Sequence, residues 1–286
     1  MKNSLMLNNG IQMPKIGFGV FRINDMKECE EAVLKAIQTG FRLIDTASAN
    51  ENEEAVGRAI KKSNISREEL FITTKLWITD TNYEGAKRGF KKSLERLGLD
   101  YIDLYLIHQP FNDYYGAWKA MEELYEAGKI RAIGVDNFTQ EKLADFIFFN
   151  KIKPAVNLIE CNALFQREED LSYLKSQEIK MQAWSPLAAG SENLLENPLL
   201  VQLSQKYQKS PAQIVLRWLI QREIVPLVKS VKPERMQENL AVFDFELEEQ
   251  DMKKITTLDT GHSCFPKRTT GHEVTAFLKA AQEFKV

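Results

Sequence analysis

Short apolar runs and amphipathic segments alternate along the chain. The runs are rich in Ile, Leu and Val and are bounded by Gly, Pro or charged residues, which is typical of buried β-strands. Strands are therefore expected at residues 16–21, 41–47, 70–77, 102–110, 130–138, 155–164, 179–187 and 224–231. Between them apolar residues recur at helical spacing, for example in residues 25–39 and 114–127, and a glycine follows both segments. The pattern predicts about eight strand–helix units and a parallel sheet.

Eight such units favour an α/β fold in which a (β/α)8 TIM barrel forms a single domain over residues 1–286. An open, doubly wound sheet is the alternative. The dinucleotide-binding turn of that fold, G-x-G-x-x-G, follows none of the expected strands, and Gly17 and Gly19 supply only a fragment of it. The barrel is therefore the preferred prediction.

The two ends of the chain add smaller elements. Asn9 and Gly10 lie between short apolar runs, which predicts a β-hairpin over residues 4–13 that caps one end of the domain. The tail from Leu258 to Val286 combines a loop with an amphipathic helix at residues 272–284. This C-terminal helical tail is expected to fold over one mouth of the barrel.

Composition narrows the partners of the protein. The 38 Lys and Arg nearly balance the 40 Asp and Glu, so no basic field attracts nucleic acid or an acidic membrane. No apolar stretch approaches the ~18 residues of a membrane span, and the N-terminus lacks a signal-peptide pattern. Cys29, Cys161 and Cys264 match no zinc or disulfide framework. We expect a cytoplasmic monomer that binds no metal.

Ionisable side chains lie at the ends of three consecutive strands. Asp45, Lys75 and His108 end the second, third and fourth expected strands. Each alone has a structural explanation, such as a turn cap, a surface lysine or a buried histidine. Because the carboxyl ends of barrel strands meet at one mouth, the three together favour a catalytic site.

A second polar group lies near the end of the chain. Lys229 and Arg235 flank an expected helix N-terminus near Pro233. Two cations at a helix N-terminus are typical of a phosphate site, whereas a solvated basic turn is the structural alternative.

Three long motifs occur in order along the chain: GFRLIDTA with NEEAVGRAI, then LIHQP, then VPLVKSVKPERMQEN. WSPL and the segment from Gly134 to Phe138 agree with them. Over essentially its whole length the chain resembles the aldo-keto reductase family, in the branch of bacterial 2,5-diketo-gluconate reductases and prostaglandin F synthases. The resemblance implies a (β/α)8 barrel, NADPH as cofactor, and hydride transfer to an aldehyde or ketone.

The resemblance also implies roles for individual residues. Lys75 would tune a proton donor, Asp45 would hold Lys75, and His108 would orient the carbonyl. Phe21, Trp77 and Phe111 would line an apolar substrate pocket. The implied cofactor-binding residues are Asp136, Asn137, Leu158, Trp184, Ser185, Leu187, Lys229, Ser230, Val231, Arg235, Glu238 and Asn239.

Within the implied cofactor set, the resemblance assigns parts of the cofactor to different residues. Trp184 would stack on the nicotinamide, and Ser185 and Leu187 would belong to a phosphate-binding loop. Lys229, Ser230 and Arg235 would hold the adenosine 2′-phosphate, which favours NADPH over NADH, and Glu238 and Asn239 would contact adenine.

The chain departs from the family pattern at three positions. Asn50 stands where the family has its catalytic Tyr, Asp136 where it usually has Ser, and Leu158 where it usually has Gln. A Tyr hydroxyl can be tuned to donate a proton, whereas the Asn amide cannot usefully do so. Since a general acid is typically worth ~10²–10⁴ in rate, carbonyl reduction is expected to be weakened or altered. An anionic Asp136 would favour the oxidised cofactor.

Two alternatives remain open at this stage. A re-purposed barrel could run cofactor-independent acid/base or lyase chemistry with Asp45, Lys75, His108 and Asp136. The chain could also be a non-catalytic NADPH-binding protein. Turnover with and without cofactor distinguishes these two alternatives from an NADPH-dependent carbonyl reductase.

Overall fold

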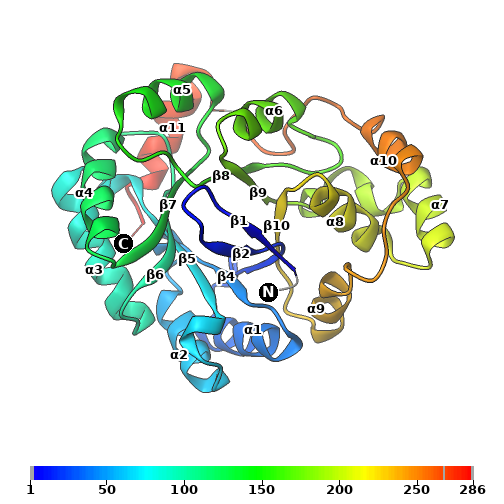
Figure 1. Cartoon of the computed structure of the whole chain (residues 1–286), viewed down its shortest axis with the longest axis horizontal. Helices are drawn as coiled ribbons and strands as arrows, with labels where there is room; N and C mark the ends of the chain where they lie inside the picture. The colour runs from blue at the N-terminus through cyan, green and yellow to red at the C-terminus, as the bar shows by residue number, and fades with distance from the viewer. Residues whose placement is uncertain (1–2, 267, 285–286) are drawn as a thin grey trace.

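Eight parallel strands close into a barrel at the centre of the molecule (Figure 1). The computed structural model describes residues 3–266 and 268–284. Around the barrel the strands follow the order β10-β3-β4-β5-β6-β7-β8-β9. Their bounds are β3 Gly17–Gly19, β4 Leu43–Asp45, β5 Phe71–Leu76, β6 Ile102–Ile107, β7 Ile130–Asp136, β8 Val156–Glu160, β9 Lys180–Trp184 and β10 Val225–Val228. The barrel prediction is confirmed, and each strand lies within one of the expected runs.

Helices surround the barrel. The α-helices are α1 Met26–Thr39, α2 Glu53–Ser63, α3 Tyr83–Leu97, α4 Tyr114–Glu126, α5 Gln140–Phe149, α6 Glu168–Ser176, α7 Pro198–Tyr207, α8 Pro211–Gln221, α9 Pro233–Leu240, α10 Glu249–Thr256 and α11 Gly271–Ala281. The 3-10 segments are η1 Ser48–Asn50, η2 Arg67–Glu69, η3 Ile78–Asp80 and η4 Ala188–Glu196. The helices expected at residues 25–39 and 114–127 are α1 and α4.

Local capping explains where these helices begin. Asp25 accepts a hydrogen bond from the backbone N–H of Glu28 at 2.7 Å and starts α1. Helix α3 starts at Tyr83, because the Asn82 side chain caps it by accepting from the N–H of Gly85 at 2.8 Å. Asp80 ends the short turn η3 that precedes this cap.

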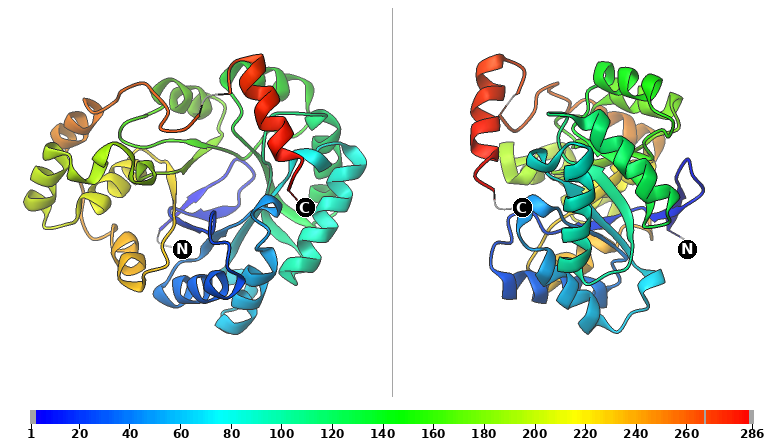
Figure 2. Two further views of the ribbon diagram at one scale, coloured as in Figure 1. Left: turned by 180° about the vertical axis from the view of Figure 1, so that it is seen from behind. Right: turned by 90° about the vertical axis from the view of Figure 1, so that its left-hand side faces the viewer.

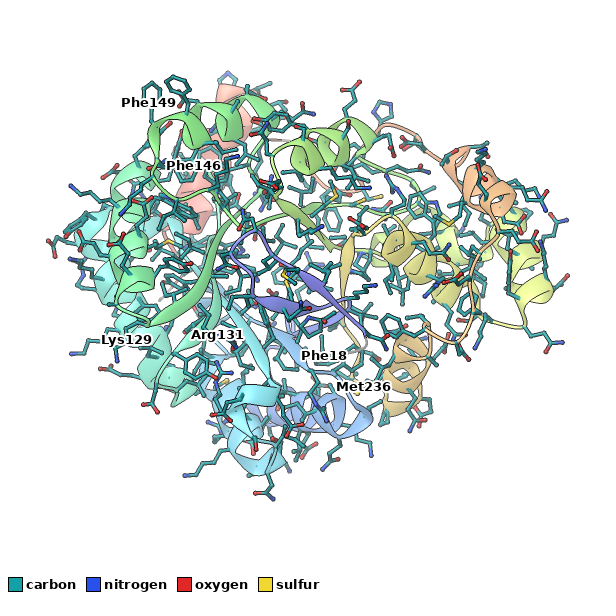
Figure 3. The ribbon with its side chains drawn as sticks, viewed as in Figure 1. Phe18, Lys129, Arg131, Phe146, Phe149 and Met236 are labelled. Atoms are coloured by element: carbon teal, nitrogen blue, oxygen red, sulfur yellow. The ribbon has the colours of Figure 1, made fainter. Side chains whose placement is uncertain are left out.

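Two apolar layers stabilise the barrel. Inside it, leucines such as Leu43, Leu104 and Leu227 fill the space between the strands. Outside it, large side chains lie between strands and helices, among them the fully buried Phe18 and Phe146. Figure 3 shows Phe146 and Phe149 on α5; Phe149 is 70% exposed, so only one face of this helix contributes to the core.

The predicted N-terminal hairpin closes one end of the barrel. Its strands, β1 Ser4–Met6 and β2 Gln12–Pro14, pair antiparallel. Leu7 in the turn between them and Met13 on β2 place their side chains in the interior apolar layer. The Asn9 amide donates to the carbonyl of Arg131, near the start of β7, at 2.9 Å. The hairpin therefore covers the end where the strands begin.

The C-terminal tail covers the opposite end, and Figure 2 shows the hairpin and α11 on opposite sides of the barrel. The indole N–H of Trp77, which follows β5, donates to the carbonyl of Ala281 in α11 at 2.9 Å. Glu160, at the end of β8, accepts from the hydroxyl of Ser263 and from the N–H of Cys264. The expected tail is confirmed, with α11 ending at Ala281; residues 267, 285 and 286 lie outside the described residues.

None of the helices within residues 3–266 and 268–284 combines the length and apolar character that crossing a bilayer requires.

Candidate active site

Lys75 and Asp45 form a buried pair at the strand ends. Asp45 is the last residue of β4, and Lys75 lies on the adjacent strand β5. Lys75 is 4% exposed, and its ammonium donates to Asp45 Oδ1 at 2.6 Å and to the carbonyl of Thr46 at 2.8 Å. Burial raises the pKa of Asp45, while the Lys75 charge opposes that increase. The predicted contact between the two residues is present.

His108 follows β6 directly and lies in the same mouth. Its ring contacts the indole of Trp77 edge-on, with 4.9 Å between ring centroids. Burial lowers the pKa of His108 well below its usual range, and the nearby cations Lys75 and Arg268 lower it further. At neutral pH the imidazole is therefore uncharged, with one nitrogen that donates and one that accepts.

Asp136, the last residue of β7, lies beside His108. Its Oδ2 is 3.8 Å from His108 Nε2, and the residue is 2% exposed. Burial raises the pKa of Asp136 well above its usual value, and the charges of Lys75 and Arg268 only partly oppose this. Burial thus favours the neutral form of this carboxyl group over the anion expected beside the nicotinamide site, and that expectation stays a prediction.

Asn50 ends the short helix η1 and is half-buried. Its backbone N–H donates to the carbonyl of Ala47 at 3.0 Å, and its side chain makes no hydrogen bond within the described residues. Its neighbour Ala49 packs against the apolar cluster of Trp77, Ile78 and the tail residue Ala281. The position expected to carry a Tyr therefore belongs to the same mouth.

Neighbouring polar residues hold the turn around Asn50 in place. The side-chain oxygen of Asn52 accepts from the Thr46 hydroxyl at 2.9 Å, and its amide donates to the carbonyl of Val20 at 3.1 Å. Glu53 accepts from the Thr74 hydroxyl at 2.6 Å. These buried bonds tie the turn to strands β4 and β5.

The expected nicotinamide residues divide into two groups. Asn137 has a left-handed backbone (φ 63°); its side-chain oxygen accepts from the indole N–H of Trp184 at 3.0 Å. The ring of Trp184 packs edge-on against Phe265, with 5.0 Å between centroids. These two residues meet at the mouth. Leu158, in contrast, packs in the interior apolar layer of the barrel.

The expected phosphate end has the properties of an anion site. Helix α9 begins at Pro233, and no side chain caps its N-terminus. Lys229 and Arg235 are exposed beside it, as is Val231 at 42% exposure. The buried Ser230 hydroxyl accepts from the N–H of Lys232 at 3.0 Å. Free helix N–H groups with adjacent cations suit a phosphate group.

The remaining cofactor residues lie on three segments. Ser185 has a left-handed backbone (φ 50°), and its carbonyl accepts from the N–H of Ala188 at 2.9 Å, so the chain turns directly after β9. Leu187 is partly buried against the outer apolar layer. On α9, Glu238 accepts from the hydroxyl of Ser210, and Asn239 is buried.

The expected apolar pocket is only partly assembled. Trp77 contacts Phe277 of α11 with 6.3 Å between ring centroids, and Phe111 contacts the same ring at 5.7 Å. Phe21 is 63% exposed and stacks with the guanidinium of Arg22 at 5.2 Å instead. Phe277 of helix α11 therefore contacts the rings of both Trp77 and Phe111, and within the described residues it makes no ring contact with Phe21.

Arg268, in the tail, is a residue of this mouth that the sequence analysis missed. Its Nη1 donates to Gln109 Oε1 at 2.9 Å, and its guanidinium lies over the ring of Phe277 at 3.9 Å. Burial lowers the pKa of Arg268, and its charge acts on both His108 and Asp136. No sequence signal marks this arginine, because only the fold of the tail brings it to the strand ends.

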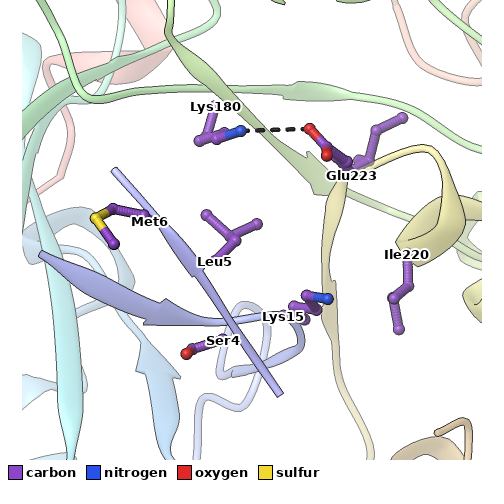
Figure 4. A pocket seen from close by; sticks show the side chains of 8 residues that line it. Ser4, Leu5, Met6, Lys15, Lys180, Ile220 and Glu223 are labelled. Carbon is purple, nitrogen blue, oxygen red and sulfur yellow. Dashed lines mark hydrogen bonds and ion pairs between the residues drawn. The ribbon is translucent and has the colours of Figure 1, made fainter. Parts of the chain in front are cut away.

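A separate hollow lies at the other end of the barrel, beside the hairpin (Figure 4). Its lining includes Leu5, Met6 and Lys15. Lys180 and Glu223 also line it and form an ion pair, with 3.3 Å between Lys180 Nζ and Glu223 Oε2. It contains none of the residues expected to carry the chemistry.

A closed barrel with its ionisable cluster at the carboxyl ends of the strands defines an α/β-barrel enzyme. The profile of the Aldo/keto reductase family matches residues 15–260. The chain belongs to the aldo/keto reductase family. The resemblance inferred from the motifs is thereby confirmed.

Individual relatives agree along almost the whole chain. The chain is 48% identical over 260 residues to the glyoxal reductase of Bacillus subtilis (strain 168), covering 91% of this chain and 94% of the relative. The structure of an aldo-keto reductase from a Medee basin deep-sea metagenome library superposes with a TM-score of 0.89 at 44% identity, covering 93% and 98% of the two chains. A Bombyx mori aldo-keto reductase in complex with NADP gives 0.88 at 32% identity, covering 92% and 94%. The predicted NADP-dependent oxidoreductase that reduces aldehydes or ketones is therefore confirmed as the class of this enzyme.

Proposed function

We propose that this enzyme reduces small aldehydes, including 1,2-dicarbonyl compounds such as glyoxal, with NADPH in preference to NADH. The observation that carries the proposal is the cluster of Asp45, Lys75 and His108 at the strand ends. Such a cluster can supply the hydrogen bond and the positive charge that a carbonyl oxygen needs during reduction. The name of the Bacillus subtilis relative supports the substrate class. The tail, by covering the mouth with α11, favours a small substrate.

Each residue of the chain has a distinct part in this reaction. A bound reduced nicotinamide would supply the hydride. Neutral His108 donates a hydrogen bond to the carbonyl oxygen and orients it. Lys75, held by Asp45, contributes positive charge where negative charge develops on that oxygen.

The residues of the chain suit such a cofactor. Arg235 and Lys229, with the uncapped N-terminus of α9, would hold the 2′-phosphate, and this is the basis for preferring NADPH. Asn137 and Trp184 would border the nicotinamide. At the same mouth, Asp136 Oδ1 is buried without a hydrogen-bond partner among the described residues.

We further propose that the enzyme works as a cytoplasmic monomer. Cys29 and Cys161 are buried and form no disulfide, which suits a reducing compartment. Size-exclusion chromatography with light scattering tests the monomer, and a dimer mass would contradict it.

The experiment is an assay of NADPH consumption with glyoxal and with a simple ketone, repeated with NADH. His108→Gln is the inactive comparison, and the exposed His262 changed to Gln is its matched control. We expect carbonyl-dependent consumption by the unaltered enzyme and by His262→Gln, with NADPH preferred. Consumption no greater than that of His108→Gln would refute the proposal. Turnover of a carbonyl substrate without nicotinamide would instead favour cofactor-independent acid/base chemistry.

A further inference from the structure

Carbonyl reduction needs a proton as well as a hydride, and this mouth lacks the usual proton source. Asn50 carries an amide, which can donate a hydrogen bond but cannot usefully release a proton. Lys75 is engaged by Asp45 and the carbonyl of Thr46. If the proposed function holds, another group at the strand ends has to supply the proton.

Asp136 has the right position for that task. Its Oδ2 lies 3.8 Å from His108 Nε2, too far for a hydrogen bond between them. Two donors at this spacing can nevertheless both reach one oxygen atom at about 2.8 Å, an ordinary O–H···O distance. The angle between the two donors, measured at that oxygen, would be roughly 85°. A substrate oxygen oriented by His108 thus lies within reach of the carboxyl group.

Neither side chain uses its remaining polar atom elsewhere. Asp136 Oδ1 and His108 Nδ1 are both buried, and within residues 3–266 and 268–284 neither has a hydrogen-bond partner. Buried polar atoms are normally paired, so two unpaired atoms in one mouth mark this pair of side chains as a functional site, in which Oδ2 and Nε2 are the atoms left to meet the substrate oxygen.

The surrounding charges suit a carboxyl group that gives up its proton during reaction. The groups that face Asp136 are Asp45 on β4, Lys75 on β5, His108 after β6 and Arg268 in the tail. Burial and Asp45 raise the pKa of Asp136, which keeps the proton in place before reaction. The positive charges of Lys75 and Arg268 then favour the carboxylate that remains.

We propose that Asp136 is the proton donor of this enzyme in place of the missing Tyr; the inference rests on the proposed function. The carbonyl carbon gains a hydride from the reduced nicotinamide, and the C=O π pair moves onto oxygen. That oxygen takes the proton as the Asp136 O–H bond breaks. The carboxylate left behind regains a proton from water before the next turnover.

The first test is spectroscopic and needs no turnover. Asp136→Asn keeps the shape of the side chain and removes the acidic proton; Asp100→Asn, at an exposed position, is the matched control. Infrared difference spectra at neutral pH are expected to show a protonated carboxyl band that is lost in Asp136→Asn and kept in Asp100→Asn. A spectrum that Asp136→Asn leaves unchanged would overturn the inference.

The second test is kinetic. At saturating NADPH, Asp136→Asn is expected to reduce glyoxal ~10²–10⁴-fold more slowly, the usual contribution of a general acid. Adding Asn50→Tyr to Asp136→Asn is expected to restore much of the rate. Equal rates in the unaltered enzyme and Asp136→Asn would overturn the inference and leave the proposed function standing. No turnover by the unaltered enzyme would refute both.

Discussion

Replacing Lys75 by Met tests the buried pair on which the site depends. The ammonium is 4% exposed and only 2.6 Å from Asp45 Oδ1, and Asp45 Oδ2 already lacks a hydrogen-bond partner among the described residues. Removing one member of a buried pair typically costs about 3–5 kcal/mol, because the other charge is left uncompensated. Met fills much of the space of the lysine stem, so the loss is mainly electrostatic.

Protonation of Asp45 limits this loss and makes it depend on pH. At pH 7, protonating an Asp with an unfolded-state pKa of ~3.9 costs about 4 kcal/mol, whereas at pH 5 it costs about 1.5 kcal/mol. Burial without Lys75 raises the pKa of Asp45 further above the unfolded value. A raised folded-state pKa means that stability is lost as pH increases. The free energy of unfolding of Lys75→Met should therefore decrease more at pH 7 than at pH 5, relative to the unaltered enzyme.

Urea unfolding at the two pH values measures this effect. Lys151→Met is a matched control, because Lys151 also lies 2.6 Å from its partner Glu126 but is exposed. Its unfolding midpoint should barely change. The double change of Asp45→Asn with Lys75→Met should recover most of the lost stability. An equal loss at pH 5 and pH 7, or no loss at all, would refute the reasoning.

Three further changes have defined outcomes. Arg235→Ala should weaken NADPH binding about tenfold in a fluorescence titration and leave NADH unaffected; an equal loss for both would remove Arg235 from the phosphate site. Asn50→Tyr should increase glyoxal reduction, but by less than ~10²-fold if Asp136 already donates the proton, as steady-state kinetics can measure. Asp103→Asn leaves Arg67 and Arg131 without the buried carboxylate that they contact at 2.6 and 2.7 Å, so calorimetry should show a Tm lowered by about 10 °C. An unchanged Tm would mean that these contacts add little.

The alternation of apolar and amphipathic segments was sufficient to predict the barrel. In a parallel sheet both faces of each strand are buried, so strands appear as continuous apolar runs that are legible without tertiary information. The same rule located Asp45, Lys75 and His108, since a charged residue at the end of an apolar run has few structural explanations. The exact residue that caps α3, Asn82, was the kind of detail that local pattern did not resolve.

Other properties of the site depend on contacts between distant segments. Leu158 and Phe21 were assigned by resemblance, and both assignments stay predictions. The structure places Leu158 in the interior apolar layer and leaves Phe21 63% exposed beside Arg22. Arg268 reaches the mouth only because the tail is anchored at Glu160 and near Trp77. Such placements depend on packing, which spacing along the chain does not encode.

By itself the sequence determined the fold class and the absence of Tyr at position 50. It also determined the order in which Asp45, Lys75 and His108 end successive strands. Only the tertiary structure decided that Asp136 and His108 lie side by side in a buried site, where burial raises the pKa of Asp136 and lowers that of His108. The physical reason is that a protonation state reflects desolvation and nearby charge, and both arise from segments that meet only when the barrel closes.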